Sequence, residues 1–141
     1  MEGLIRKNFR EEIEQVIERL DCATICEFSE LPGPTAIPAA KGIYIIFDKN
    51  SKKVLYVGKT TNLRQRLYHN HLMGPISNAR LKKYLLEDEG YPEITDLVEA
   101  KKYIRNHCSF LYLLEDDFRE RGHLEGLVSF ICNCYYVDLE H

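Results

Sequence analysis

Apolar residues recur along the chain with two different periods, and these periods predict where helices and strands form. From Ile13 to Leu20 the apolar positions have helical spacing, and Asn8 followed by Glu11 resembles a capping box in front of them. Residues 31–38 then contain three prolines and a glycine, which favour extended or turning backbone. We therefore expect an amphipathic helix and then a connector that leads into the main folding unit.

Three short apolar segments are typical of strands. Residues 42–47 and 53–57 are β-branched and aromatic runs, and residues 48–52 between them form a polar loop of turn-forming residues. This arrangement predicts a β-hairpin. A third apolar run of strand length covers residues 108–114.

Helical patterns lie between and after these strands. Leu63 and Leu67 mark the buried face of a helix that follows a polar cap and runs to about His71. Three further helices are expected: one capped by Ser77, a weaker one over residues 96–104, and one opened by Asp117 with Glu120. Strands interrupted by helices predict an α+β fold, with a small three-stranded, mainly antiparallel sheet flanked by helices and an extra N-terminal helix.

The composition fits one globular domain. With 141 residues, 45% of them hydrophobic, the chain can build one core but is too short for two full domains. No apolar run approaches the roughly eighteen residues that a membrane span needs, and the first residues lack the apolar stretch of a secretory signal. The five cysteines are odd in number and mostly have apolar neighbours, which favours reduced thiols over a disulfide framework. We expect a cytoplasmic protein with no membrane partner.

Three segments follow from these patterns. Residues 1–40 form the N-terminal helix and proline-rich connector, residues 41–138 form the main domain, and residues 139–141 resemble the start of a vector-encoded Leu-Glu-polyhistidine tag. The formal net charge is −3. Because nonspecific affinity for nucleic acids comes largely from Lys and Arg that neutralise phosphates, we do not expect tight binding by this piece alone.

The strongest chemical signal is a set of four elements at defined intervals. The predicted hairpin carries two tripeptides, Gly42-Ile43-Tyr44 and Tyr56-Val57-Gly58, and Arg66 follows in the next helix. Two tyrosines on paired strands and an arginine on the next helix are able to converge on one phosphate. Together with Glu125 in the last helix, this pattern resembles the GIY-YIG nuclease superfamily, which includes homing endonucleases, excision-repair and junction-cutting nucleases, and some restriction enzymes. The resemblance covers about residues 42–131.

The resemblance implies a metal-dependent endonuclease domain that hydrolyses DNA phosphodiester bonds. Glu125 would hold one divalent ion, Mg²⁺ or Mn²⁺, which prefers oxygen ligands and keeps most of its waters. Arg66 would contact the scissile phosphate through its planar, permanently charged guanidinium. Tyr44 would act as the general base or orient the water, and Tyr56 would hydrogen-bond to the phosphate or the water. A phenol has a pKa near 10, so Tyr44 needs help to lose its proton.

Two positions depart from the family pattern. The family commonly has His or Tyr four residues after the arginine, where this chain has Asn70. On a regular α-helix His69 lies closer than His71 to the side that carries Arg66, so His69 is the preferred candidate for proton transfer. A late asparagine that supports the metal site in many members has no clear equivalent, because Asn133 lies only eight residues after Glu125.

Basic residues near the motif are candidates for contacts with DNA. Lys59 and Arg64, with Arg66, are the preferred nucleic-acid-binding residues, while Lys82 and Lys83 either follow the phosphate backbone or form a solvated face. Nothing resembles a recognition helix, so specificity would come from a further domain or a protein partner. RNA remains an alternative substrate.

A second hypothesis belongs to a different class of protein. A catalytically weak or silent relative would serve as a nucleic-acid-binding or protein-interaction module, and Asn70 is the residue that favours it. The retention of both tyrosines, Arg66 and Glu125 favours the enzyme. Glu125 also has a structural alternative, because Arg121 stands four residues before it at the spacing of a helical ion pair.

Overall fold

The computed structural model describes residues 1–138, without the side chain of Asn78, so the expected tag remnant at residues 139–141 lies outside the described part. The α-helices are α1 (Phe9–Cys22), α2 (Arg80–Glu87), α3 (Leu97–His107) and α4 (Phe118–Ile131). A π-helix, η3, spans Gln65–Leu72, and short 3-10 turns are η1 (Phe28–Glu30), η2 (Pro34–Ala36) and η4 (Ile76–Asn78). The strands are β1 (Cys26–Glu27), β2 (Gly42–Asp48), β3 (Val54–Thr60) and β4 (Cys108–Leu114).

The predicted α+β class is confirmed, but the sheet has four strands rather than three. Their order is β1-β4-β2-β3, and every pair is antiparallel. The additional strand, β1, pairs Cys26 with Phe110 and Glu27 with Ser109. Two residues are too few to show an alternating pattern, which is why the sequence gives no local signal for this strand.

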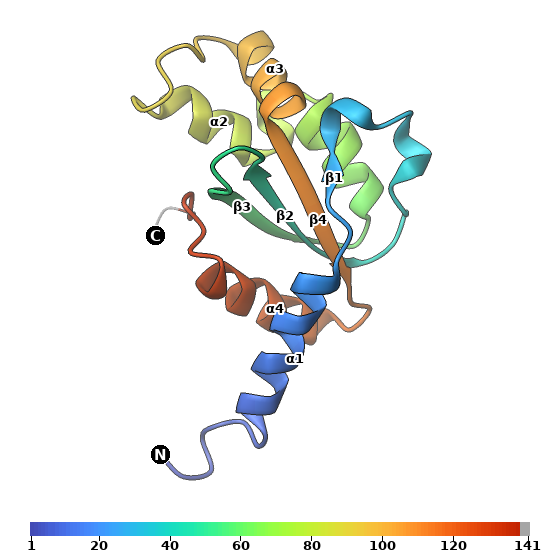
Figure 1. Ribbon diagram of the computed structural model, residues 1–141, viewed down its shortest axis with the longest axis vertical. Coiled ribbons are helices and arrows are strands. Elements are labelled where there is room, and N and C mark those ends of the chain that lie inside the picture. The colour runs from blue at the N-terminus through green and yellow to red at the C-terminus, as the bar shows by residue number, and fades with distance from the viewer. Residues whose placement is uncertain (139–141) are drawn as a thin grey trace.

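Helices cover both faces of the sheet. The alternating side chains of β2 divide between two apolar clusters: Tyr44 and Ile46 join one, and Ile43 and Ile45 join the other. The first cluster includes buried residues of η3, α2 and α3, and the second includes buried residues of α1 and α4. In Figure 1, α2 and α3 lie on one side of the sheet and α1 and α4 on the other. The result is a central sheet between two helical layers.

The helix ends test the predicted caps. The side chain of Asp117 accepts a hydrogen bond from the Glu120 amide, as the sequence predicts. Asp96 caps α3 in the same way, a role that the sequence analysis did not assign to it. The capping box at Asn8 is wrong: this residue has a left-handed backbone with φ 65° and no side-chain cap bond. Ser77 is not the cap of the third helix either, because α2 begins at Arg80 and Ser77 belongs to the preceding turn.

Strand β3 is the edge of the sheet, and only part of that edge is covered. The amides of Tyr135 and Tyr136 donate to the carbonyls of Val54 and Leu55, so the segment after α4 covers the start of β3. The other end of β3, toward Lys59, faces the cleft described below. Within residues 1–138, no helix has the length and apolar character needed to cross a membrane.

Candidate active site

The two glycines of the tripeptides let the strands and Tyr44 approach closely. Gly58 lies opposite Tyr44 in the β2–β3 register, and a β-carbon at Gly58 would overlap the Tyr44 hydroxyl and its ring. A β-carbon at Gly42 would overlap the carbonyl of Leu113 on β4. These glycines are therefore needed for close approach, and the one at position 58 makes room for the phenol that it faces.

A cleft of about 380 Å³ brings the four predicted residues together. Tyr44 comes from β2, Tyr56 from β3, Arg66 from η3 and Glu125 from α4. The remaining lining residues are Gly58, Lys59, Ser77, Ala79, Arg80 and Asp138. Four side chains of three chemical types, from four elements, thus meet in one hollow.

The position of the cleft explains how Glu125 reaches the two tyrosines. Helix α4 and η3 pack on opposite faces of the sheet. If these two elements packed over a central strand, the sheet would separate Glu125 from Arg66. Because β3 is the edge strand, residues of both layers meet around it. The backbone amide of Lys59 in β3 hydrogen-bonds to the Glu125 carboxylate and holds it at this edge.

Tyr44 is hydrogen-bonded to a histidine of η3. Its hydroxyl and Nε2 of His71 share a buried hydrogen bond of 2.8 Å. Burial raises the pKa of Tyr44 well above its ordinary value, although nearby Arg66 opposes this shift. The pKa of His71 is well below its ordinary value, first because the ring is buried and then because Arg66 and Lys82 are close. At neutral pH the pair is therefore a neutral phenol beside a neutral imidazole.

The π-helix determines which histidine faces the site. Residues five positions apart, rather than four, are joined in a π-helix, and His71 stands five positions after Arg66. The extra residue in the turn explains why Asn70 occupies the expected position while His71 contacts Tyr44. His69 is exposed and does not line the cleft. Its preference over His71 rested on α-helical spacing, which η3 does not have.

The electrostatics of the cleft suit a hard cation. Burial is the main cause that raises the pKa of Glu125, Asp138 adds to it, and Lys59 opposes it. Within residues 1–138, no group of three or more His, Cys, Asp or Glu side chains is placed to hold a metal ion. A cation here would depend on Glu125, with Asp138 nearby, and on water for the rest of its coordination. That donor set fits Mg²⁺ or Mn²⁺, which accept oxygen ligands and keep waters.

Several predicted basic residues have other contacts. Lys59 lines the cleft, as expected of a DNA-binding residue, but Arg64 does not, and its Nε donates to the carbonyl of Ile37 at 2.8 Å. Arg121 is buried, and its guanidinium donates to the carbonyls of Glu115 and Asp116 instead of pairing with Glu125. The hydrogen bond from Arg64 to Ile37 therefore links the start of η3 to the proline-rich connector.

The cleft also contains residues that the sequence did not indicate. Arg80 and Asp138 form an ion pair of 2.5 Å, and Tyr84 donates to the other oxygen of Asp138 at 2.7 Å. The sequence analysis considered Asn133 as the late polar residue of the metal site. Asp138, which lies further along the chain from Glu125, lines the cleft. Only its contacts reveal this role, because the segment after α4 has no regular pattern.

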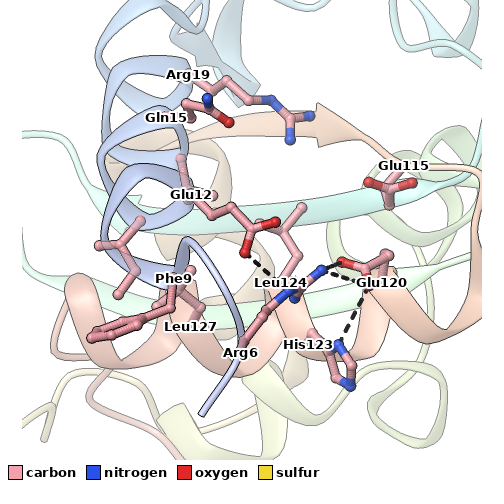
Figure 2. A pocket seen from close by; sticks show the side chains of 12 residues that line it. Arg6, Phe9, Glu12, Gln15, Arg19, Glu115, Glu120, His123, Leu124 and Leu127 are labelled. Atoms are coloured by element: carbon pink, nitrogen blue, oxygen red, sulfur yellow. Dashed lines mark hydrogen bonds and ion pairs between the residues drawn. The ribbon is translucent and has the colours of Figure 1, made fainter. Parts of the chain in front are cut away.

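A second pocket, of about 340 Å³, lies between α1 and α4 (Figure 2). There the Arg6 guanidinium lies 2.9 Å from a Glu12 carboxylate oxygen and 3.0 Å from one of Glu120. These partly exposed pairs contribute little stability each. None of the predicted catalytic residues lines this pocket. The candidate active site is therefore the cleft beside β3.

The sequence profile of the GIY-YIG catalytic domain matches residues 40–94. This segment contains both tripeptides and Arg66, whereas Glu125 lies beyond it. The predicted resemblance to the GIY-YIG nucleases is confirmed over this segment, and it indicates a nuclease.

One relative is the UvrABC system protein C of Dictyoglomus thermophilum. It is 42% identical over 74 residues, a match that covers 47% of this chain and 12% of the relative. The chain therefore matches only a small part of that protein's length.

Proposed function

We propose that this chain is a metal-dependent endonuclease domain that hydrolyses DNA phosphodiester bonds in the cleft beside β3. The observation that carries this proposal is the meeting of Tyr44, Tyr56, Arg66 and Glu125 in one hollow of about 380 Å³. Each residue type has a role in phosphodiester hydrolysis, and no single element of the fold supplies more than one of them.

Arg66 and Tyr56 bind and orient the phosphate. The guanidinium donates to the phosphoryl oxygens, where negative charge grows as the attacking water approaches phosphorus. The Tyr56 hydroxyl donates to the same group or to the water. Lys59 also lines the cleft and contacts the neighbouring backbone phosphate.

Tyr44 and His71 remove the proton from the attacking water. When His71 carries its proton on Nδ1, Nε2 accepts from the Tyr44 hydroxyl, and the phenol oxygen accepts from the water. The water oxygen bonds to phosphorus as the bond to the 3′-oxygen breaks, and the water proton replaces the phenol proton that passes to Nε2. This route avoids a free phenolate, which the raised pKa of Tyr44 disfavours, and the lowered pKa of His71 makes the imidazolium short-lived because it releases its proton readily. The departing 3′-oxygen takes a proton from solvent, and His71 releases the proton on Nε2 to solvent, which restores the neutral pair.

Glu125 is the residue that holds the divalent cation, and Asp138 is the second carboxylate at the same place. When bound, Mg²⁺ or Mn²⁺ supplies positive charge that stabilises the phosphoryl group and the departing oxygen. Burial is the main cause of the raised pKa of Glu125, and the nearby Asp138 carboxylate adds to it, so a bound cation would favour the ionised form.

DNA is the proposed substrate, and DNA repair is the proposed setting. The support is the similarity to a UvrABC system protein C together with a family that includes excision-repair nucleases. The match covers 12% of that relative, so a specificity domain or protein partner is part of the proposal.

Cleavage of supercoiled, single-stranded and branched DNA in Mg²⁺ or Mn²⁺ tests this function. The parent is compared with Arg66→Ala and Glu125→Ala, and with Arg119→Ala and Glu89→Ala as matched controls at exposed positions. We expect cutting by the parent and both controls, and losses of about 10²–10³-fold in the two cleft variants. No cutting by the parent favours the silent binding module instead, and equal cutting by the cleft variants contradicts the assignment of the activity to this cleft.

A further inference from the structure

Lys82 is a buried lysine beside the candidate active site. It is fully buried on α2, between the core residues Leu81 and Leu85, whereas its neighbour Lys83 is exposed. Neither sequence interpretation of Lys82 fits this position, because a buried ammonium neither follows a DNA backbone nor lies on a solvated face.

Its ammonium group donates to three carbonyl oxygens at the end of η3. The acceptors are the carbonyls of Asn70, in a short contact, of Gly74 at 2.8 Å and of His71 at 3.3 Å. An ammonium has three N–H donors, so these bonds use all of them. The carbonyls at the C-terminal end of a helix carry partial negative charge. That of Asn70 also accepts from the Gly74 amide, and the ammonium adds a charged donor to it and to its neighbours. Lys82 therefore caps the π-helix.

The position of His71 depends on this backbone. Nε2 of the ring bonds to Tyr44, while Nδ1 is buried and has no hydrogen-bond partner among the described residues. With a single polar contact, the ring direction is set mainly by packing and by the backbone that carries it. Lys82 bonds to the carbonyl of His71 itself and to that of the residue before it.

Packing alone does not account for a charged residue here. Burial lowers the pKa of Lys82 to about 8, with Lys101 and Arg66 contributing, so the folded state bears a desolvation cost. A methionine has a similar length and would fill the same space without that cost. A π-helix is a rare conformation that needs support from its surroundings. The ammonium group provides this support where an apolar side chain would not.

We propose that Lys82 is a positioning residue that holds the end of the π-helix so that His71 faces Tyr44. This role rests on the proposed function, in which His71 receives the proton from Tyr44. Lys82 touches neither the DNA nor the reacting atoms and acts through the main chain of η3.

The test compares Lys82→Met with two controls. Lys102→Met removes an exposed lysine, and Val16→Ala weakens the core on the other side of the sheet. Two readouts are measured: kcat and KM on a DNA substrate, and long-range ¹H–¹⁵N spectra of the histidine rings in the DNA-free protein. The His71 signals are assigned by their loss in His71→Gln.

We expect Lys82→Met to lower kcat by about 10–100-fold with little change in KM, because misplacing a reacting group by about 1 Å has an effect of this size. Its His71 signals should shift toward those of a titrating, solvent-exposed ring. Val16→Ala and Lys102→Met should keep the parent kcat and spectrum. Lys82→Gln, which keeps two N–H donors, should fall between the parent and the methionine variant.

Parent-like His71 signals in Lys82→Met would overturn the proposal, as would a loss of kcat no larger than that of Val16→Ala. Loss of the fold in both Lys82 variants would also overturn it, since Lys82 would then support the whole domain rather than the direction of His71. The spectra need no catalysis. If the parent fails to cut DNA, they still test Lys82, so failure of the nuclease function and failure of this inference are separate results.

Discussion

Replacing Gly58 with alanine should damage the site through a single methyl group. The new β-carbon would overlap the hydroxyl and Cζ of Tyr44 and lie 2.7 Å from Cε1. Tyr44 is 0% exposed and packs in the core, so a shift of the ring would disturb its apolar neighbours and its bond to His71. The clash involves a rigid ring rather than the end of a flexible chain, and it occurs at the atom proposed to receive the water proton.

The free energies oppose each other, and their sizes decide the outcome. In a strand, alanine is favoured over glycine by about 0.5–1 kcal/mol, while overpacking a well-filled core costs about 1–3 kcal/mol. We expect a net loss of about 1–2 kcal/mol in the free energy of unfolding. A shift of Tyr44 by about 1 Å should reduce kcat by roughly 100-fold. Urea denaturation measures the first effect and single-turnover DNA cleavage the second.

Gly126→Ala is the matched control. Gly126 lies on α4 next to Glu125, and a β-carbon there meets nothing within 4 Å. This variant should be more stable by about 0.5–1 kcal/mol and fully active, because alanine favours the helix. If Gly58→Ala is as stable and as active as Gly126→Ala, the close contact with Tyr44 does not exist as described and the reasoning is refuted.

Three further predictions concern charge and pH. The pKa of His71 is lower in the folded state than in the unfolded state, so unfolded chains bind more protons as the pH falls below about 6.5. The free energy of unfolding measured in urea should therefore decrease from pH 7 to pH 5. An equal decrease in His71→Gln would contradict this prediction. The pKa of Glu125 is raised by folding, so its ionised form destabilises the folded state. In metal-free buffer, Glu125→Gln should therefore raise the Tm at pH 7 and have less effect on it near pH 4. An equal change in Tm at the two pH values would contradict this prediction. Arg64→Ala removes the hydrogen bond to the Ile37 carbonyl and should cost about 1 kcal/mol in urea denaturation with no change in the KM for DNA; a clear rise in KM would restore Arg64 as a DNA contact.

Local sequence signals predicted most of the fold. The apolar run at residues 108–114 matches β4 residue for residue, and the cap at Asp117 correctly opens α4. Both signals lie within the segment that they describe. Strand β1 was missed because its two residues gain their structure only by pairing with Phe110 and Ser109, far away in the chain.

The meeting of four residues in one cleft was predictable, but the other lining residues and the internal geometry were not. The intervals between Tyr44, Tyr56, Arg66 and Glu125 indicated one site, and these residues do line one cleft. The π-helix could not be predicted from the sequence. Over so short a segment, the spacing of apolar residues does not distinguish hydrogen bonds between residues four apart from those between residues five apart.

The error at Lys82 has a related cause. A lysine beside another lysine on a helix is typical of a solvated face. Its burial depends on three carbonyls at the end of η3, and their position follows from the π-helical turn. Because the sequence does not reveal the π-helix, it does not reveal the role of Lys82 at the end of that helix either.

The most direct measurement is the single-turnover rate of DNA cleavage by the parent, Arg66→Ala, Glu125→Gln and the double variant, in excess Mg²⁺ and again with the cation removed by a chelator. If the four side chains act as one site, each single variant should lose about 10²–10³ in rate. The double variant should lose little more than the worse single variant, since residues that act as a unit are not additive. The chelator should abolish cutting by the parent. A parent-like rate in either single variant, or full cutting without a divalent cation, would contradict a metal-dependent nuclease site in this cleft.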